Sequence, residues 1–336
     1  MDAGLAIAIG LAFAFALTNG FHDASNAIAT LVATRAATPL QAVVLASVFT
    51  MLGPILIGSA VAATIAGIVQ VPADEIVAVV GAGLIGATAW NLITWWRGLP
   101  SSSGQALVGG LVGAALVEGG MGAVNWGGFD GWRPVGVIGT LVAIAVSPVL
   151  GGLAAFLVLR ALRRGLRRGS SRLRTPVNRS QWVGAATLAF SHGANDAQKA
   201  VGLVAAMLVA SGKTDSLAAP LWVTVGSAAA LTIGTIFPGW RIVETIGQRI
   251  YRIRALDGVS SQAGSSAVIL GASFLGAPIS TSHVVSASIV GIGAGRKRWH
   301  HVRWRIVRDI GIAWLTTIPA TAAIAAVAFP IWRWIA

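Results

Sequence analysis

The sequence predicts an all-α protein that crosses a membrane many times, and three observations lead to this fold class. Of the 336 residues, 55% are hydrophobic and only 10% are charged, whereas soluble domains carry about a quarter of charged residues. The mean hydropathy is +0.78. Apolar runs of about 20 residues recur, which is the length of a helix that crosses the hydrocarbon core, and they lack the alternation of barrel strands.

Ten apolar runs are predicted as membrane helices, five in each half of the chain. Polar breaks beside several of them indicate broken helices or re-entrant hairpins, so we expect about 10–12 membrane segments. A basic segment, Ile242–Arg254, is predicted as an amphipathic helix at the membrane surface. The predicted runs cover residues 3–19, 40–68, 76–96, 104–123, 135–160, 181–210, 219–240, 260–277, 283–295 and 309–332.

The net charge of +13 comes from basic residues that lie mostly in the loops between apolar runs. This distribution is typical of residues that set membrane orientation, so we expect no binding to nucleic acid. Residues 160–180 contain eight arginines and no acidic residue, which predicts a cytoplasmic location. Threading the other loops around this segment places both termini outside the cytoplasm, in a multi-pass protein of the cell (inner or plasma) membrane. The oligomeric state stays open, with a homodimer as one expectation.

The two halves of the chain resemble each other in sequence. Asn19–Ala24 aligns with His192–Ala197, 173 residues later, and Pro100–Gly113 aligns with Pro278–Gly291, 178 residues later. An odd number of crossings in each half gives the halves opposite orientations. Inverted repeats with polar, glycine-broken segments at matching positions are the pattern of secondary transporters. The predicted division is a first membrane repeat at 1–159, a basic connection at 160–180 and a second, inverted repeat at 181–336.

Two hydroxyl-rich motifs each follow an apolar run and begin another. A proline ends the incoming helix, and serine or threonine then caps the next one. At membrane depth such a break must be buried in protein or line a cavity, and the free N–H groups of the new helix favour an anion. Two such helix starts predict a site for a tetrahedral oxyanion, with an ordinary serine-capped loop as the alternative. The residues of this anion site are Ser101, Ser102, Ser103, Ser280, Thr281 and Ser282.

Asp23 and Asp196 lie within apolar runs, where ionised side chains are costly and usually functional. The alternative for Asp196 is a structural ion pair with Lys199, three residues later. Two carboxylates would repel an anion unless each binds a compensating cation, either Na⁺ or a proton. A dianion that enters a negative interior loses about 4.6 kcal/mol per 100 mV, so about two coupled cations are needed to cancel its charge. Neutral oxygens for a hard cation are available from Asn19, Ser25, Asn26, Asn195 and Gln198.

Four segments resemble the signature of the inorganic phosphate transporter (Pit) family: "NGFHDASNAIAT", "GLPSSSGQALVGGLVGAAL", "AFSHGANDAQKAVG" and "PISTSHVVSASIVG". The resemblance is to permeases of the bacterial low-affinity type, and it implies a symporter that takes up inorganic phosphate with H⁺ or Na⁺. It also implies an inverted-repeat fold with broken helices or hairpins. By position it implies a phosphate side at the six hydroxyl residues and a cation side, with a candidate Na⁺ site, at Asp23, Asn26, Asn195 and Asp196.

One residue departs from the family pattern, because His22 stands where the family often has Asn. Imidazole is a poor sodium ligand and a good proton carrier near neutral pH, so His22 favours coupling to protons. Bacterial proteins with this variant resemble transporters of metal–phosphate complexes, which makes a divalent metal complexed with phosphate another expected cargo. No cofactor is predicted, and the absence of cysteine excludes disulfides and thiolate metal sites.

Other polar residues near the motifs are secondary candidates. His283 could bind the anion, relay a proton or only cap a helix, and Lys199 could neutralise the anion or pair with Asp196. Alternative functions are the transport of sulfate or another tetrahedral oxyanion and, from a different class, an intramembrane lipid-phosphate phosphatase. Such an enzyme would need arginines or a metal at its site, whereas the arginines here lie in loops, so we expect no enzyme. The secondary candidates are Gln105, His192, Gln198, Lys199 and His283.

Overall fold

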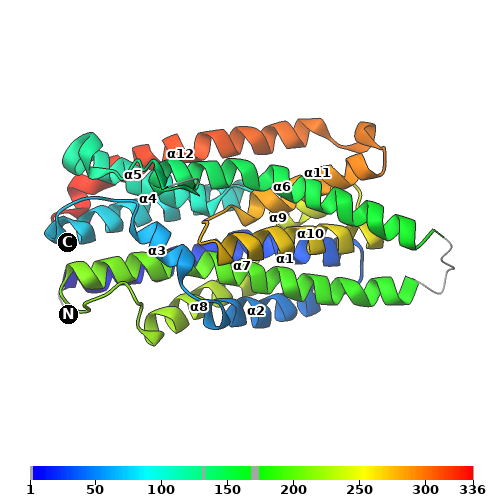
Figure 1. Cartoon of the computed structure of the whole chain (residues 1–336), viewed down its shortest axis with the longest axis horizontal. Helices are drawn as coiled ribbons and strands as arrows, with labels where there is room; N and C mark the ends of the chain where they lie inside the picture. Colours follow the sequence, from blue (N-terminus) through cyan, green and yellow to red (C-terminus); the bar gives the residue numbers. More distant parts are fainter. Residues whose placement is uncertain (1–2, 131–132, 168–173, 336) are drawn as a thin grey trace.

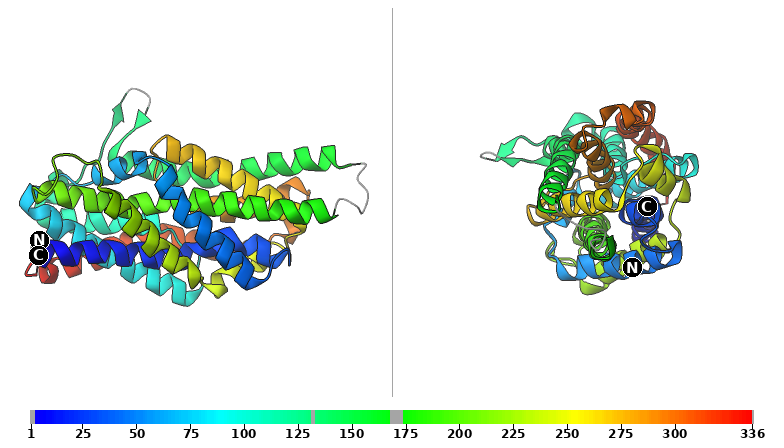
Figure 2. Two further views of the ribbon diagram at one scale, coloured as in Figure 1. Left: turned by 90° about the horizontal axis from the view of Figure 1, so that it is seen from below. Right: turned by 90° about the vertical axis from the view of Figure 1, so that its right-hand side faces the viewer.

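The computed structural model describes residues 3–130, 133–167 and 174–335 and confirms the all-α fold class. The helices form an elongated bundle and run roughly along its long axis (Figure 1). Two short strands, β1 (Phe129–Asp130) and β2 (Arg133–Pro134), pair as an antiparallel hairpin that projects from the side of the bundle (Figure 2).

Among the described residues, the first half of the chain has six α-helices. The first of them continues to Ala33, well beyond the predicted end at residue 19, so the polar motif around Asp23 is part of a helix. The predicted run 40–68 is broken near Gly58 into two helices. The bounds are α1 (Ala3–Ala33), α2 (Pro39–Leu56), α3 (Ala60–Ala66), α4 (Ile76–Arg97), α5 (Ser103–Gly119) and α6 (Gly136–Gly165).

The second half repeats this order of helices. α7 has 37 residues, and the second polar motif lies inside it. The predicted surface helix Ile242–Arg254 is represented by α9 and a π-helical turn at Thr245–Arg249, and this segment is bent by 71° from α8. The bounds are α7 (Arg174–Ala210), α8 (Leu221–Ile236), α9 (Trp240–Glu244), α10 (Ala255–Phe274), α11 (Thr281–Gly295) and α12 (Trp304–Trp332).

Six helices of the described residues are long and apolar enough to cross a membrane, and a seventh span results if α8 and the bent segment after it count as one. The six are α1, α2, α4, α5, α6 and α12. The protein is therefore a multi-pass membrane protein. The predicted number of 10–12 segments also counts shorter and more polar helices, such as α10 and α11, which form hairpins and broken spans.

The two halves have opposite orientations. Both termini lie at one end of the bundle, whereas the end of α6 and the start of α7 lie at the other (Figure 1). α7 runs in the opposite direction to α1, and α12 runs in the opposite direction to α6 (Figure 1). The halves also exchange partners, because α5 packs on α12 and α11 on α6, while α1 packs on α8 and α7 on α2. This interlocked arrangement is an inverted repeat.

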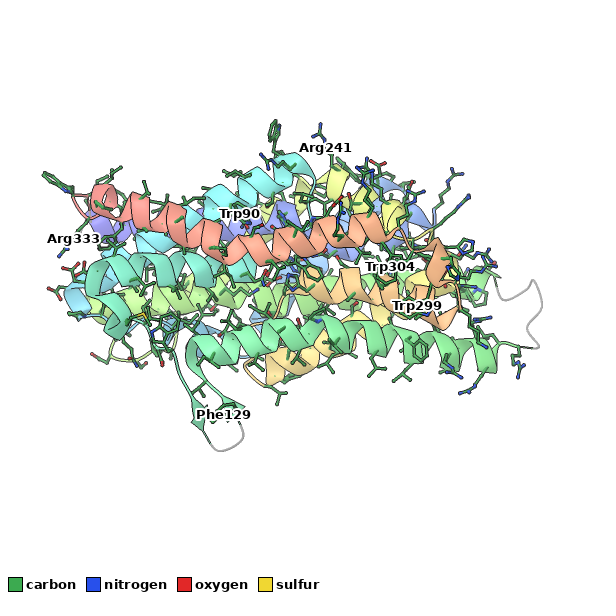
Figure 3. The ribbon with its side chains drawn as sticks, turned by 90° about the horizontal axis from the view of Figure 1, so that it is seen from above. Trp90, Phe129, Arg241, Trp299, Trp304 and Arg333 are labelled. Carbon is green, nitrogen blue, oxygen red and sulfur yellow. The ribbon has the colours of Figure 1, made fainter. Side chains whose placement is uncertain are left out.

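Two helical hairpins enter the bundle from opposite ends. Arg333, after α12, pairs with Glu75 before α4 (2.5 Å) and with Glu118 of α5 (3.0 Å), so the outer ends of α4 and α5 lie beside the termini. Trp299 and Trp304, which follow α11, lie at the other end of the molecule (Figure 3). The connections α4–α5 and α10–α11 therefore meet in the middle of the bundle.

Glycines set the position of the two long motif helices against their neighbours. A Cβ on Gly20 of α1 would lie 2.1 Å from the carbonyl oxygen of Leu231 in α8. The equivalent Gly193 of α7 would place a Cβ 2.1 Å from the carbonyl oxygen of Thr50 in α2. Only glycine permits backbones to pack at this distance, and small residues at helix crossings are typical of membrane interiors. Both crossings hold the polar motifs next to the hairpin tips.

Candidate functional site

The tips of the two hairpins begin their second helices with equivalent serine caps, as the sequence predicts. The hydroxyl of Ser102 accepts a hydrogen bond from the N–H of Gln105 (3.1 Å), and that of Ser280 accepts one from the N–H of His283 (3.2 Å). The predicted hydroxyl residues of both tips are buried. The first N–H groups of a helix have no partner within it, so each tip presents donors and a positive dipole end in the protein interior.

Asp23 lies at the centre of the site and contacts both hairpin tips. Its carboxylate accepts hydrogen bonds from Ser103 of α5 (2.9 Å) and Ser282 of α11 (2.5 Å). On α1 itself, Nδ1 of His22 lies 3.0 Å away and the amide of Asn26 donates at 3.3 Å. Only 2% of the Asp23 surface is exposed, so this carboxylate is stabilised by polar side chains and not by bulk water.

Asp196 occupies the equivalent position on α7 and has different neighbours. It forms an ion pair with Lys199, and Nδ1 of His192 lies 2.6 Å from its other oxygen. Thr281 of α11 donates a hydrogen bond to it at 3.0 Å. The ion pair that the sequence left open as an alternative for Asp196 and Lys199 is therefore present. Adjacent residues of one helix, Thr281 and Ser282, thus contact the two carboxylates.

The remaining predicted residues lie around Asp23 and Asp196. They differ in how many of their polar atoms already form hydrogen bonds within the protein. Nε2 of His22 lies 3.2 Å from the hydroxyls of Thr94 and Ser101. The amide nitrogen of Asn195 donates to the hydroxyl of Ser273 in α10 (3.0 Å) and to the carbonyl of Ala277 in the connection between α10 and α11 (3.3 Å). Gln198 is less available than expected, because its oxygen accepts from the N–H of Val61 (2.9 Å) and its nitrogen donates to a backbone carbonyl.

Several buried polar atoms around the carboxylates have no hydrogen-bond partner within the described residues. They are the amide oxygens of Asn26, Asn195 and Gln105, the amide nitrogen of Asn19, Nε2 of His192 and Nε2 of His283. Such atoms are rare in protein interiors and need an explanation. No group of three or more His, Cys, Asp or Glu side chains of the described residues could hold a metal ion. A cation at this site would therefore depend on neutral oxygens beside a carboxylate.

Two contacts at the site were not predicted. Trp314 of α12 stacks on His283, with 3.7 Å between the ring centroids, and its indole N–H donates to the carbonyl of Pro100 at 3.0 Å. It therefore connects the two hairpin tips. Thr94 of α4 contacts His22 and Ser101. Tryptophans of membrane proteins usually lie in interfacial belts, so nothing in the sequence pattern distinguishes Trp314 from the others.

Comparisons with known proteins give the family. A sequence model described as "Phosphate transporter family" matches residues 19–176 and 167–325, so it matches each half once. A protein of Rhizobium meliloti (strain 1021), named "Probable low-affinity inorganic phosphate transporter", is 38% identical over 336 residues, and the match covers 98% of both chains. A protein of Bacillus subtilis (strain 168) with the same name is 38% identical, over 95% of this chain and 94% of its own length.

A solved structure has the same fold. It is described as "The sodium-dependent phosphate transporter", and it aligns with a TM-score of 0.86 and 26% identity over 99% of this chain and 100% of its own. The family match covers both halves, and the relatives are similar over nearly their whole length. The chain therefore belongs to the phosphate transporter family, whose function is transport and not enzymatic catalysis.

Proposed function

We propose that this protein is a secondary active symporter that takes up inorganic phosphate together with a cation. One observation carries the proposal: hydroxyls from two hairpins that enter from opposite ends, those of Ser103 and Ser282, both donate to the same buried carboxylate, Asp23. This shared contact supports an anion site and a cation site that adjoin each other. The names of the relatives and of the solved structure support phosphate as the anion.

Phosphate binds, in this proposal, between the N-termini of α5 and α11. The first-turn N–H groups supply donors to the oxygen atoms of a tetrahedral anion, together with the hydroxyls of Ser102 and Ser280, which accept the cap hydrogen bonds and keep their own hydrogens. The dipoles of the two helices point their positive ends at the same place, as in other transporters that bind anions at broken helices. Trp314 keeps the two tips in register through His283 and Pro100.

The coupling cation binds at Asp23, where the unpartnered amide oxygen of Asn26 and the hydroxyls of Ser103 and Ser282 are available. We propose that this cation is a proton, because Nδ1 of His22 lies 3.0 Å from the carboxylate and its Nε2 contacts two hydroxyls. Na⁺ is the alternative, since the solved structure of the same fold is named as sodium-dependent. The transported anion, in this proposal, is phosphate alone or phosphate complexed with a divalent metal.

The charge distribution supports an orientation for the proposed uptake. The end of the bundle where α6 ends, with Arg163 and Arg164 in its last turn, lies opposite the two termini (Figure 1). Because basic loops stay on the cytoplasmic side, we propose that both termini face the outside of the cell membrane. Phosphate would then reach the site past the α4–α5 hairpin and leave it past the α10–α11 hairpin.

Reconstitution into liposomes tests the proposal. Labelled phosphate is followed while gradients of H⁺ and Na⁺ are imposed separately, with and without Mg²⁺, and with an excess of sulfate as competitor. We expect an inward proton gradient to drive phosphate accumulation. An excess of sulfate should not inhibit this accumulation. Accumulation driven only by a Na⁺ gradient would identify Na⁺ and not H⁺ as the coupling ion. Phosphate movement that follows only the phosphate gradient would refute symport.

A further inference from the structure

The inverted repeat gives each motif residue an equivalent in the other half, so the two carboxylate sites can be compared atom by atom. The alignment pairs Asp23 with Asp196 and Ser103 with Thr281. The structure preserves their contact, because Ser103 donates to Asp23 at 2.9 Å and Thr281 donates to Asp196 at 3.0 Å. Each half thus builds the same contact between a carboxylate and the tip of its own hairpin.

The other contact of each site crosses between the halves, and here the two sites differ. In the first site the amide of Asn26 donates to Ser282 at 2.9 Å. The equivalents of these residues are Lys199 and Gly104. A Cβ on Gly104 would lie 3.2 Å from Nζ of Lys199. The ammonium of Lys199 therefore occupies the place where the first site has a neutral amide and a hydroxyl.

We propose that the Lys199 ammonium is a tethered cation that takes the place of a second transported cation. The first site combines a carboxylate with neutral oxygens and binds a cation from solution. The second site carries its positive charge on the chain itself, next to Asp196. This inference rests on the proposed cation-coupled symport and deepens it. Of the two carboxylate sites, the one at Asp23 binds a coupling cation and the one at Asp196 does not.

Three features favour this role over that of an ordinary structural ion pair. Lys199 is 1% exposed, and replacing buried ion pairs by apolar residues often leaves stability unchanged, so stability alone does not explain the pair. Its Nζ also donates to the carbonyl of Ile279 at the tip of the α10–α11 hairpin (3.3 Å). The ammonium thus lies between the Asp196 carboxylate and the tip of the α10–α11 hairpin. A cation bound at Asp23 would lie in the equivalent position of the first site. Finally, the equivalent of Ser282 is glycine, which leaves room for the ammonium.

The substitution Lys199→Asn makes the second site resemble the first. Asp196 then lacks its tethered charge and recruits a cation from solution. The control is Lys213→Asn, the same chemical change at an exposed lysine in the loop after α7. In liposomes, the phosphate gradient at which net flux stops is measured against the imposed gradient of the driving cation. Because each tenfold cation gradient supplies about 1.4 kcal/mol per coupled ion, one additional ion should raise the limiting phosphate gradient about tenfold.

The double variant Gly104→Ser with Lys199→Asn copies the first site more fully, and it should bind the recruited cation more tightly than Lys199→Asn alone. The reverse change, Asn26→Lys with Ser282→Gly, should tether a charge at Asp23 and abolish cation-driven accumulation. An inserted Lys199→Asn protein with the stoichiometry of the wild type would overturn the inference.

The wild-type protein provides a test that needs no variant. With a single binding site for the driving ion, its limiting phosphate gradient should correspond to one coupled cation per phosphate, and a value of two or more would overturn the inference. If the wild type shows no cation-driven accumulation, the proposed symport itself fails. The two failures are therefore distinguishable.

Discussion

Replacing Asp23 with Asn separates cation coupling from phosphate binding, because the structure predicts that the variant keeps its hydrogen bonds. The new amide oxygen can accept from Ser282, and the new amide nitrogen can donate to Ser103. Ser103 also has an alternative acceptor, the amide oxygen of Asn19 at 2.8 Å. The packing around the site is unchanged, so the variant loses one negative charge and, in the proposed symport, the cation that this charge binds.

The magnitude follows from the energy of moving one charge. A coupled cation gains about 2.3 kcal/mol in crossing a potential of 100 mV. A tenfold ratio corresponds to about 1.4 kcal/mol, so loss of this ion should reduce the limiting accumulation of phosphate roughly 40-fold at that potential. Exchange of external for internal phosphate needs no net movement of charge and should persist.

Both quantities are measured on the same proteoliposomes: accumulation under an imposed potential and cation gradient, and exchange of labelled phosphate at equilibrium without gradients. Unchanged accumulation in the inserted variant would refute the coupling role of Asp23. Loss of exchange together with accumulation would also contradict the reasoning, since it would show that the carboxylate is required for binding phosphate.

Three further predictions concern the second site, the helix caps and a helix crossing. Asp196→Asn should destabilise the protein by about 3–5 kcal/mol, because it leaves the Lys199 ammonium buried without its partner; an unchanged melting temperature in detergent would contradict this. Ser102→Ala combined with Ser280→Ala should cost about 1 kcal/mol for each cap and raise the apparent KM for phosphate, and an unchanged KM would place the anion elsewhere. Gly193→Ala should lower thermal stability by about 1–3 kcal/mol or more, because its Cβ would overlap the backbone of α2, whereas Gly10→Ala, with no atom nearby, is the matched control.

Much of the architecture could be predicted from the sequence, because hydrocarbon imposes a length on helices and the duplication imposes a symmetry. The prolines and serines at 100–103 and 278–282 mark the starts of α5 and α11 within two residues of where the structure has them. The break between α2 and α3 could not be predicted, since apolar residues surround it on both sides. The predicted end of the first helix, at residue 19, lies before the observed end at Ala33, because polar residues inside a helix resemble a loop in the sequence until their partners are known.

The candidate site was predicted less completely than the fold. The repeat pairs Asp23 with Asp196 and the two hydroxyl motifs with each other, and the structure brings these groups together. The sequence could not decide whether Lys199 pairs with Asp196, because spacing along a helix permits contact without requiring it. Trp314 and Thr94 reach the site from other helices, and contacts between distant segments leave no periodic trace in one sequence.

The shared carboxylate of Asp23 has a consequence for how opposite gates are linked. One of the two hydroxyls that donate to it, that of Ser103, belongs to the α4–α5 hairpin. The other, that of Ser282, belongs to the α10–α11 hairpin, which enters from the opposite end of the bundle. An ion that arrives there competes with both hydroxyls at once. In the proposed symport, a cation bound to the Asp23 carboxylate therefore acts directly on both hairpins, and no long chain of side chains is needed between them.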